Sequence, residues 1–296
     1  MPCDSSLVGI TLGPFEYEID QFWTMAYAAG LGDSNPRYLD SLKSGHLIAH
    51  PVFPVCLALR AMGPMDQLMF DAGLTHEESI RRVHATQDMI LHRPIRPPEK
   101  VLVSTTLALM ERRKPGTYLV TRYDIKDSAG APIATVNWGR IFRSVEMNGP
   151  DRVAEIASAP KVHARAEEHG VRGSFPIRIA ETAAIVYTAC ARPGNPVNFH
   201  TDTVEAQRSG LPAPILMGVA TLGMSVSKII EAEADGDPAR VSRVYGRFSS
   251  MVLMPSEVTV RVLARERSSE GDAISFVTAT EDGGRAIRDG VVTLHP

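Results

Sequence analysis

The chain has 296 residues, of which 44% are hydrophobic, and a formal net charge of −3. This length and composition are typical of a globular protein with one large or two medium domains. Positive and negative residues nearly balance and there is no run of Lys or Arg, which excludes the electrostatic pattern of a protein that binds nucleic acid or an anionic membrane.

Cysteine content and hydropathy place further bounds on the class of protein. The cysteines are odd in number and widely spaced, at Cys3, Cys56 and Cys190. They are therefore predicted to be reduced thiols without a disulfide framework. No apolar run approaches the roughly 18 residues of a membrane span, and the N-terminus has no signal-peptide pattern. We expect a soluble, cytoplasmic protein that does not bind membranes.

The first part of the chain begins with a Tyr-led stretch that contains Asn-Pro, "YAAGLGDSNPRYLD" from Tyr27. A proline-led apolar run, "AHPVFPVCLALRAM" from Ala49, predicts a helix, and Pro64 is expected to kink or end that helix. The segments "VLVSTTLALMER" and "TYLVTRYDIKDSAGAPIATVNWGRIF" alternate between apolar and polar residues. They predict antiparallel strands, the second segment as a hairpin around 127–130.

A polar segment from Met147 to Gly173 separates this part from the rest of the chain. It has no alternation of apolar residues and carries Gly and Pro at its ends, which is typical of a linker. We therefore divide the chain into an N-terminal unit at 1–148, a linker at 149–173 and a C-terminal unit at 174–296.

The C-terminal unit contains the same kinds of segment in the same order. "YTACARPGNPVNFHTD" begins at Tyr187, and "MGVATLGMSVSKII", from Met217 to Ile230, is apolar nearly all round, which predicts a buried helix. The segments "EVTVRVLARE" and "AISFVTATED" alternate like half-solvated antiparallel strands.

Three pairs of stretches match between the two units at a spacing near 160 residues. In both units a Tyr precedes Asn-Pro by eight positions, as Tyr27 precedes Asn35 and Tyr187 precedes Asn195. A proline-led helix start and a proline-marked turn before a strand follow in the same order. The chain is thus predicted to be a tandem repeat of one α+β unit, in which an antiparallel sheet wraps a buried helix.

These stretches resemble the MaoC-like, or type 2 (R-specific), enoyl-CoA hydratases and 3-hydroxyacyl-thioester dehydratases in their tandem double-hotdog form. The resemblance covers essentially the whole chain. In the first half it lies in "HPVFP" and "HATQDMILHRPIRPPEKV". In the second half it lies in Asn195, Pro196, His200, Asp202, Gly210, Pro214, Ile215 and Gly218. It implies a lyase with a double hotdog fold that acts on an acyl thioester.

The second half departs from the commonest family pattern, Asp-x-Asn-Pro-x-His followed by His-Gly at the helix start. Pro193 stands where the Asp is expected, and Met217 replaces the His before Gly218. Two extra residues separate Asn195-Pro196 from His200, a spacing similar to the branch of the family with a longer loop.

The first half keeps a different part of the pattern. Asp33 precedes Asn35-Pro36, but Tyr38 stands where the His would fall. Since the two loops serve separate pockets in the family, Asp33 is expected to form a turn rather than to share a site with His200. The resemblance implies that this half, at 1–148, binds the acyl chain.

Adding water to an enoyl thioester requires a base for the water, an acid for Cα and donors for the thioester oxygen. His200 can accept and return a proton near neutral pH. Asn195 is a candidate to bind the water or the substrate carbonyl. Asp202, or another carboxylate, is a candidate to fix the tautomer of His200 or to hold the water. We therefore name His200, Asn195 and Asp202 as candidate catalytic residues.

The start of the second helix is the candidate substrate-binding element. The N–H of Gly218 lacks an intrahelical partner and has the helix dipole behind it. The resemblance implies that this N–H polarises the thioester, with Met217 and Pro214 beside the substrate. No metal or redox cofactor is expected, and the CoA or acyl-carrier thioester is the expected partner of a monomer or homodimer.

Structural roles remain open for each candidate. Asn195 is equally a turn former, Asp202 could cap a short helix that ends at Gly210, and Gly218 could serve helix packing. At the level of function, the losses at Pro193 and Met217 leave open a noncatalytic protein that binds an acyl thioester or another hydrophobic ligand. A thioesterase on the same fold is a second alternative.

Overall fold

The computed structural model describes residues 3–160, 170–268 and 271–296. The first half contains the strands β1 (Cys3–Asp4), β2 (Thr11–Ile19), β3 (Arg82–Leu91), β4 (Glu99–Arg113), β5 (Gly116–Asp127), β6 (Pro132–Arg143), β7 (Met147–Asn148) and β8 (Arg152–Val153). Its helices are η1 (Ser5–Leu7), α1 (Gln21–Gly30), α2 (Pro36–Leu39), α3 (Ser41–Ser44), α4 (Pro54–Asp71) and α5 (His76–Ser79).

The second half repeats this order with fewer short helices. Its strands are β9 (Gly173–Ile179), β10 (Val241–Phe248), β11 (Ser256–Ser268), β12 (Gly271–Thr280) and β13 (Arg285–Leu294). Its helices are α6 (Ala183–Ala191), α7 (Thr203–Arg208), α8 (Gly218–Glu233) and the short η3 (Pro238–Arg240). No helix of the described residues is long and apolar enough to cross a membrane.

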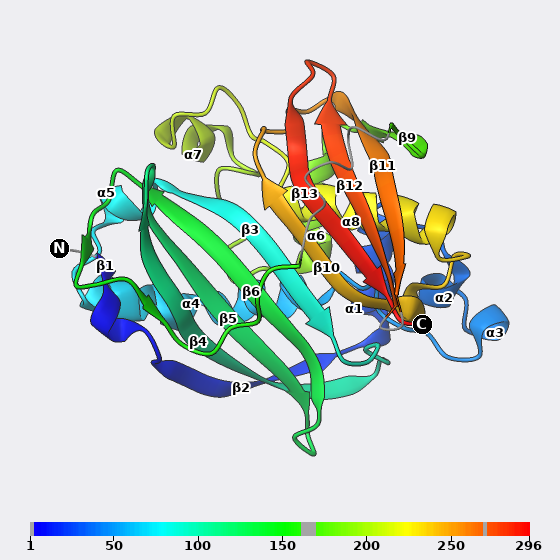
Figure 1. Cartoon of the computed structure of the whole chain (residues 1–296), viewed down its shortest axis with the longest axis horizontal. Coiled ribbons are helices and arrows are strands. Elements are labelled where there is room, and N and C mark those ends of the chain that lie inside the picture. Colours follow the sequence, from blue (N-terminus) through cyan, green and yellow to red (C-terminus); the bar gives the residue numbers. More distant parts are fainter. Residues whose placement is uncertain (1–2, 161–169, 269–270) are drawn as a thin grey trace.

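One antiparallel sheet runs through both halves, in the order β2-β4-β5-β6-β3-β10-β13-β12-β11-β9, with β8 beside β4. The two halves meet where β3 pairs with β10, with Tyr245 opposite Asp88 (Figure 1). At this seam the guanidinium of Arg243 donates two hydrogen bonds of 2.8 Å to the carboxylate of Asp88. Backbone pairing and a charge-assisted contact therefore fix the relative register of the halves.

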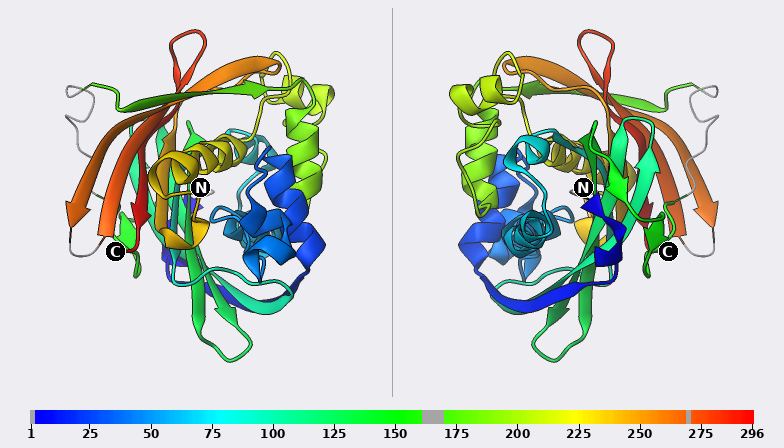
Figure 2. Two further views of the ribbon diagram at one scale, coloured as in Figure 1. Left: turned by 90° about the vertical axis from the view of Figure 1, so that its right-hand side faces the viewer. Right: turned by 90° about the vertical axis from the view of Figure 1, so that its left-hand side faces the viewer.

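Each half wraps its part of the sheet around one central helix. α4 packs on β4 and β6, and α8 packs on β10, β11 and β13. Figure 2 shows the helices gathered on the concave side of the sheet. The apolar faces of both helices are buried, and most of α8 is buried on all sides. The predicted α+β architecture of two hotdog units is confirmed.

The repeat is visible at the contact between α1 and α6, which pack against each other. The hydroxyls of Tyr27 and Tyr187, which are 160 positions apart in the sequence, lie 3.4 Å from each other. Both rings are fully buried. Equivalent residues of two copies meet in this way only close to a two-fold axis, so the halves are arranged like the subunits of a symmetric dimer.

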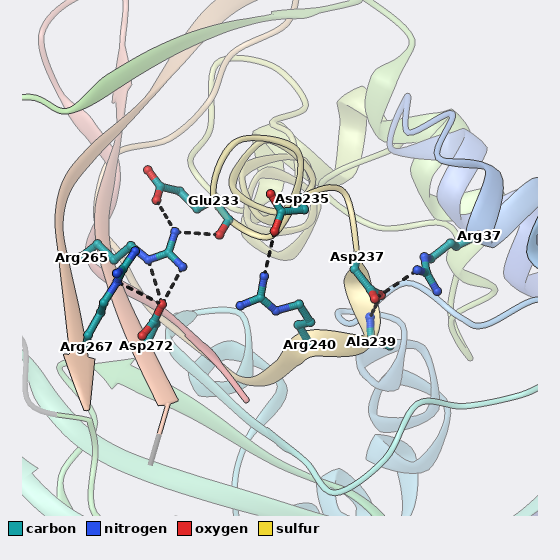
Figure 3. Close-up of polar contacts among 9 residues, drawn as sticks. All are labelled: Arg37, Glu233, Asp235, Asp237, Ala239, Arg240, Arg265, Arg267 and Asp272. Carbon is teal, nitrogen blue, oxygen red and sulfur yellow. Dashed lines mark hydrogen bonds and ion pairs between the residues drawn. The ribbon is translucent and has the colours of Figure 1, made fainter. Parts of the chain in front are cut away.

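Ion pairs hold the end of α8 and the segment after it (Figure 3). Arg265 on β11 contacts Glu233 at 3.1 Å and Asp272 on β12 at 2.9 Å. Beyond the helix, Asp237 pairs with Arg37 of the first half at 3.1 Å. Partly exposed pairs of this kind are each worth roughly 1 kcal/mol or less, so they orient the chain more than they stabilise it.

Two features differ from the sequence-based expectations. α4 does not end at Pro64 but continues to Asp71. Ala61, Met65 and Met69 around it are fully buried, and burial of such side chains outweighs the roughly 3 kcal/mol cost of an interior proline.

The predicted linker is not wholly irregular, because β7 and β8 lie at its start. Residues 161–169 of the linker lie outside the described residues. The division into 1–148, 149–173 and 174–296 stays a prediction.

Candidate active site

The segment between α6 and α8 carries most of the predicted site residues. It begins after Arg192, which ends α6 with a left-handed conformation (φ 52°), and it contains the short helix α7. Its tip is built around Asn198. The side-chain oxygen of Asn198 accepts the backbone N–H of His200 at 2.9 Å, and its amide donates to the carbonyl of Asn195 at 3.0 Å. These bonds fix the backbone at His200.

The ring of His200 is hydrogen-bonded to the irregular segment that leads into α8. Its Nδ1 lies 2.8 Å from the carbonyl oxygen of Ile215. Because a carbonyl only accepts hydrogen bonds, Nδ1 carries the proton and Nε2 keeps a lone pair. Within the described residues Nε2 has no hydrogen-bond partner. Burial lowers the pKa of His200 to about 4, so the imidazole is a neutral base at physiological pH.

The start of α8 offers two open hydrogen-bond donors. Ala220 and Thr221 both donate their N–H to the carbonyl of Met217. Among the described residues, the N–H groups of Gly218 and Val219 have no acceptor. The helix dipole adds partial positive charge at this point, so these two donors suit a developing negative charge.

Gly218 also permits a close packing contact. A β-carbon at this position would lie 2.7 Å from the ring of Phe248 at the end of β10. The packing role and the donor role of Gly218 are compatible, because they use different sides of the residue. Met217 is buried, caps α8 without a side-chain hydrogen bond, and offers no proton-transfer group. Pro214 is half-buried next to Ile215.

Asp202 does not set the tautomer of His200. Its carboxylate accepts the N–H of Glu205 at 2.9 Å and caps α7, as the alternative reading anticipated. The carbonyl of Ile215 takes the tautomer-setting place instead. A water-holding role for Asp202 stays a prediction.

Asn195 occupies an exposed turn. Its side-chain oxygen accepts the N–H of Val197 at 3.3 Å. The residue that holds the loop at His200 is Asn198, which the sequence analysis did not single out. The signal was its place two positions before the histidine, where Asn commonly bonds a following backbone N–H. A direct role of Asn195 with substrate stays a prediction.

In the described residues, the equivalent region of the first half has neither a histidine nitrogen without a partner nor open N–H groups at the helix start. α4 begins at Pro54, which has no N–H, and the N–H groups of Val55 and Cys56 are taken by the carbonyls of Val52 and Phe53. The nearby His50 is fully buried and uses both ring nitrogens. Nδ1 accepts the N–H of Val52 at 3.1 Å, and Nε2 lies 3.1 Å from the hydroxyl of Ser227.

Asp33 stabilises a turn, as expected. One carboxylate oxygen accepts the N–H of Asn35 at 2.9 Å, and the other lies 4.0 Å from His50. The amide of Asn35 donates to Gly236 of the second half at 2.8 Å, so the first Asn-Pro connects the halves. Tyr38 is buried against His50 at a ring separation of 5.4 Å.

Together, the fold and the site define a double hotdog in which, among the described residues, the second half alone places a neutral imidazole beside open helix-start donors. A FAS1-like dehydratase domain region matches residues 6–136, and a MaoC-like domain matches residues 163–283. The chain belongs to the MaoC-like family of hydratases and dehydratases. In the described residues, no cluster of three His, Cys, Asp or Glu side chains could hold a metal ion.

Similar proteins cover one half or the whole chain. A UPF0336 protein of Streptomyces coelicolor is 30% identical over 152 residues, which are 49% of this chain and 99% of that protein. The 3-hydroxyacyl-thioester dehydratase Y of Mycobacterium tuberculosis is 26% identical over 301 residues, which are 99% and 98% of the two chains. A MaoC-like dehydratase from Phytophthora capsici shares the fold, with a TM-score of 0.78, 18% identity and coverage of 98% and 96%.

Proposed function

We propose that this chain hydrates an enoyl thioester, or dehydrates a 3-hydroxyacyl thioester in the reverse direction, with His200 as the acid/base. One observation carries the proposal: the neutral His200 presents a bare Nε2 close to a helix start with two open N–H groups. Similarity over nearly the full length to a 3-hydroxyacyl-thioester dehydratase supports the same reaction class.

The hydration step uses each of these groups once. Nε2 of His200 takes a proton from water as the water oxygen bonds to Cβ of the substrate. Electron density moves through the broken double bond to the thioester oxygen, which the N–H groups of Gly218 and Val219 stabilise. Cα then takes the proton back from Nε2, so His200 ends the cycle neutral.

The substrate is an acyl thioester of CoA or of an acyl carrier. We assign acyl-chain binding to the first half, at 1–148. The apolar side chains beside Pro54, such as Leu91, Ile95 and Ile133, suit an acyl chain, but the cavity between them is only about 20 Å³, so these side chains must move apart to admit one. A cytoplasmic location and a monomeric or homodimeric state remain part of the proposal.

The test is the loss of absorbance of the enoyl-thioester band with purified protein and a panel of straight and branched enoyl-CoAs. The wild type should remove the band with at least one substrate, and His200→Ala should not. His92→Ala is the matched control, since His92 is exposed at the end of β3 and should leave turnover unchanged. Equal turnover by wild type and His200→Ala would reject the role of His200.

Noncatalytic binding is the alternative favoured by the replacements at Pro193 and Met217. It predicts that enoyl-CoA binds to the wild type while the absorbance band persists for every substrate in the panel. Release of free thiol from saturated acyl-CoA would point to a thioesterase instead.

A further inference from the structure

His84 of the first half lies among the residues that surround the start of α8. It stands on the inner face of β3, where its ring stacks on Trp138 of β6 with centroids 3.9 Å apart and planes at 8°. The other neighbour is Phe248, at a ring separation of 4.5 Å. Phe248 in turn lies against Gly218. A single aromatic ring thus separates His84 from the helix start that we assign to the thioester.

The hydrogen bond of His84 determines which of its nitrogens is available. Nε2 lies 3.1 Å from the carbonyl oxygen of Thr86, so Nε2 carries the proton and Nδ1 keeps its lone pair. In the described part of the chain Nδ1 has no hydrogen-bond partner. The ring is half-buried, and its stacking on Trp138 holds this orientation.

His84 and His200 lie near the same helix start: His84 contacts it through Phe248, and His200 bonds the carbonyl of Ile215, three positions before Gly218. Burial is the main reason that the pKa of His84 falls to about 3; the Thr86 carbonyl opposes the fall, while Arg140 and His200 add to it. Both imidazoles are therefore neutral at physiological pH, and each presents one bare nitrogen. Two lone pairs cannot bond to each other, but one water molecule with two O–H groups can donate to both.

We propose that Nδ1 of His84 holds the attacking water together with Nε2 of His200, in the place of the carboxylate that the second half lacks at Pro193. This inference rests on the proposed function and makes the site a joint product of the two halves. The hydratase reaction needs the water oriented at Cβ, and a single base leaves one of its O–H groups undirected.

His84 keeps the same protonation state throughout the hydration step. One O–H bond of the water breaks and its proton passes to Nε2 of His200, while the water oxygen bonds to Cβ. The second O–H bond remains and becomes the hydroxyl of the product, donating throughout to Nδ1 of His84. The proton held by His200 then passes to Cα.

Two variants distinguish the proposed water-holding role of His84 from a purely structural role of its stacked ring. His84→Phe keeps an aromatic ring on Trp138 but removes the acceptor. His84→Asn loses the ring but can place Oδ1 where Nδ1 stood. With crotonyl-CoA or the best enoyl-CoA of the panel, we expect His84→Phe to lower kcat about 10²-fold with little change in KM. His84→Asn should retain more activity than His84→Phe.

The controls decide the remaining outcomes. His92→Ala, one residue beyond the end of the same strand, should match the wild type. If thermal unfolding shows that His84→Phe is not folded, His84→Ala serves as the acceptor-free variant and should also be slower than His84→Asn. Wild-type kcat in a folded acceptor-free variant would reject the role of His84 but leave the proposed function standing. The same holds if kcat falls equally in the acceptor-free variant and in His84→Asn. If the wild type hydrates no substrate, the proposed function fails, and this role fails with it.

Discussion

The starts of α4 and α8 occupy equivalent places in the two halves, yet in the described part of the chain they differ in the hydrogen-bonding groups that they leave open. At α8, Gly218 and Val219 present open N–H groups beside a histidine with a bare nitrogen. At α4, Pro54 has no N–H, and both nitrogens of the fully buried His50 are engaged. The same supersecondary unit therefore supports a site or a packed core, depending on a few residues at one helix start.

The comparison separates what the unit needs in order to fold from what the site needs in order to react. A proline at the first helical position pre-sets the backbone and costs no intrahelical bond, so Pro54 suits a helix start that needs no open N–H. Gly218 has no such advantage for folding. Gly218 instead allows close packing against Phe248 and leaves an N–H open at the helix start.

The largest effects on turnover and on stability are expected when His200 and His50 are each replaced by glutamine in separate variants. His200→Gln removes the base and should lower kcat by 10²- to 10⁴-fold, with a change in unfolding free energy below about 1 kcal/mol. His50→Gln should do the opposite, since it leaves the buried N–H of Val52 without its acceptor and costs about 1–3 kcal/mol. Denaturant unfolding and turnover of both variants would test this. Loss of activity in a folded His50→Gln would contradict the division of roles.

The second prediction concerns the first residue of each helix, Gly218 of α8 and Pro54 of α4. Gly218→Pro removes one donor and should lower kcat about 10²- to 10³-fold relative to Gly218→Ala, which keeps the N–H but adds a β-carbon against Phe248. Using Gly218→Ala as the reference separates the missing donor from the crowding. Pro54→Gly should not restore turnover to His200→Gln, because His50, the histidine nearest to this helix start, uses both of its ring nitrogens. Similar rates for Gly218→Pro and Gly218→Ala would show that the N–H is not used.

The buried His50 should make stability depend on pH. Burial lowers its pKa to about 4 in spite of the nearby Asp33, whereas an unfolded histidine titrates near 6.5. The unfolded chain therefore binds the proton more readily, and acid favours unfolding. Between pH 6.5 and 4 we expect the unfolding free energy to fall by up to about 3 kcal/mol on account of His50. Denaturant titrations of His50→Gln should show a shallower fall, and an identical slope would reject the assignment.

The smallest effect is expected at the contact between equivalent tyrosines. Tyr27→Phe or Tyr187→Phe alone leaves one buried hydroxyl without its 3.4 Å neighbour and should cost about 1 kcal/mol. The double replacement should cost less than the sum of the two, because neither hydroxyl is then left unpaired. A double-mutant cycle in denaturant measures the coupling, and additive effects would show that the two hydroxyls do not interact.

Much of the fold could be predicted because it rests on local patterns. The apolar run at 217–230 and the alternating segments around it become α8 and its strands, with the hairpin near 127–130 between β5 and β6. The expected end of the helix at Pro64 was wrong, since the burial of Met65 and Met69 outweighs a local propensity, and the alternative of a kink stays a prediction.

The site was harder to predict because its decisive contacts join distant residues. His200 was identified from its motif, but its tautomer depends on Ile215, fifteen positions away. Asp202 lies closer in the sequence, yet its carboxylate caps α7. His84 was not singled out as a site residue, because only the pairing of β3 with β10 brings it near Phe248. Sequence spacing gives no measure of such contacts.

The continuous sheet across the β3–β10 seam also bears on how the two halves could diverge. In a dimer of identical subunits, any substitution at the helix start changes both sites at once, so a proline there would remove both sets of donors. Here the two copies are separate stretches of one chain, and Pro54 and Gly218 are encoded independently. Covalent duplication thus lets one copy give up its chemistry and specialise, while the other retains it.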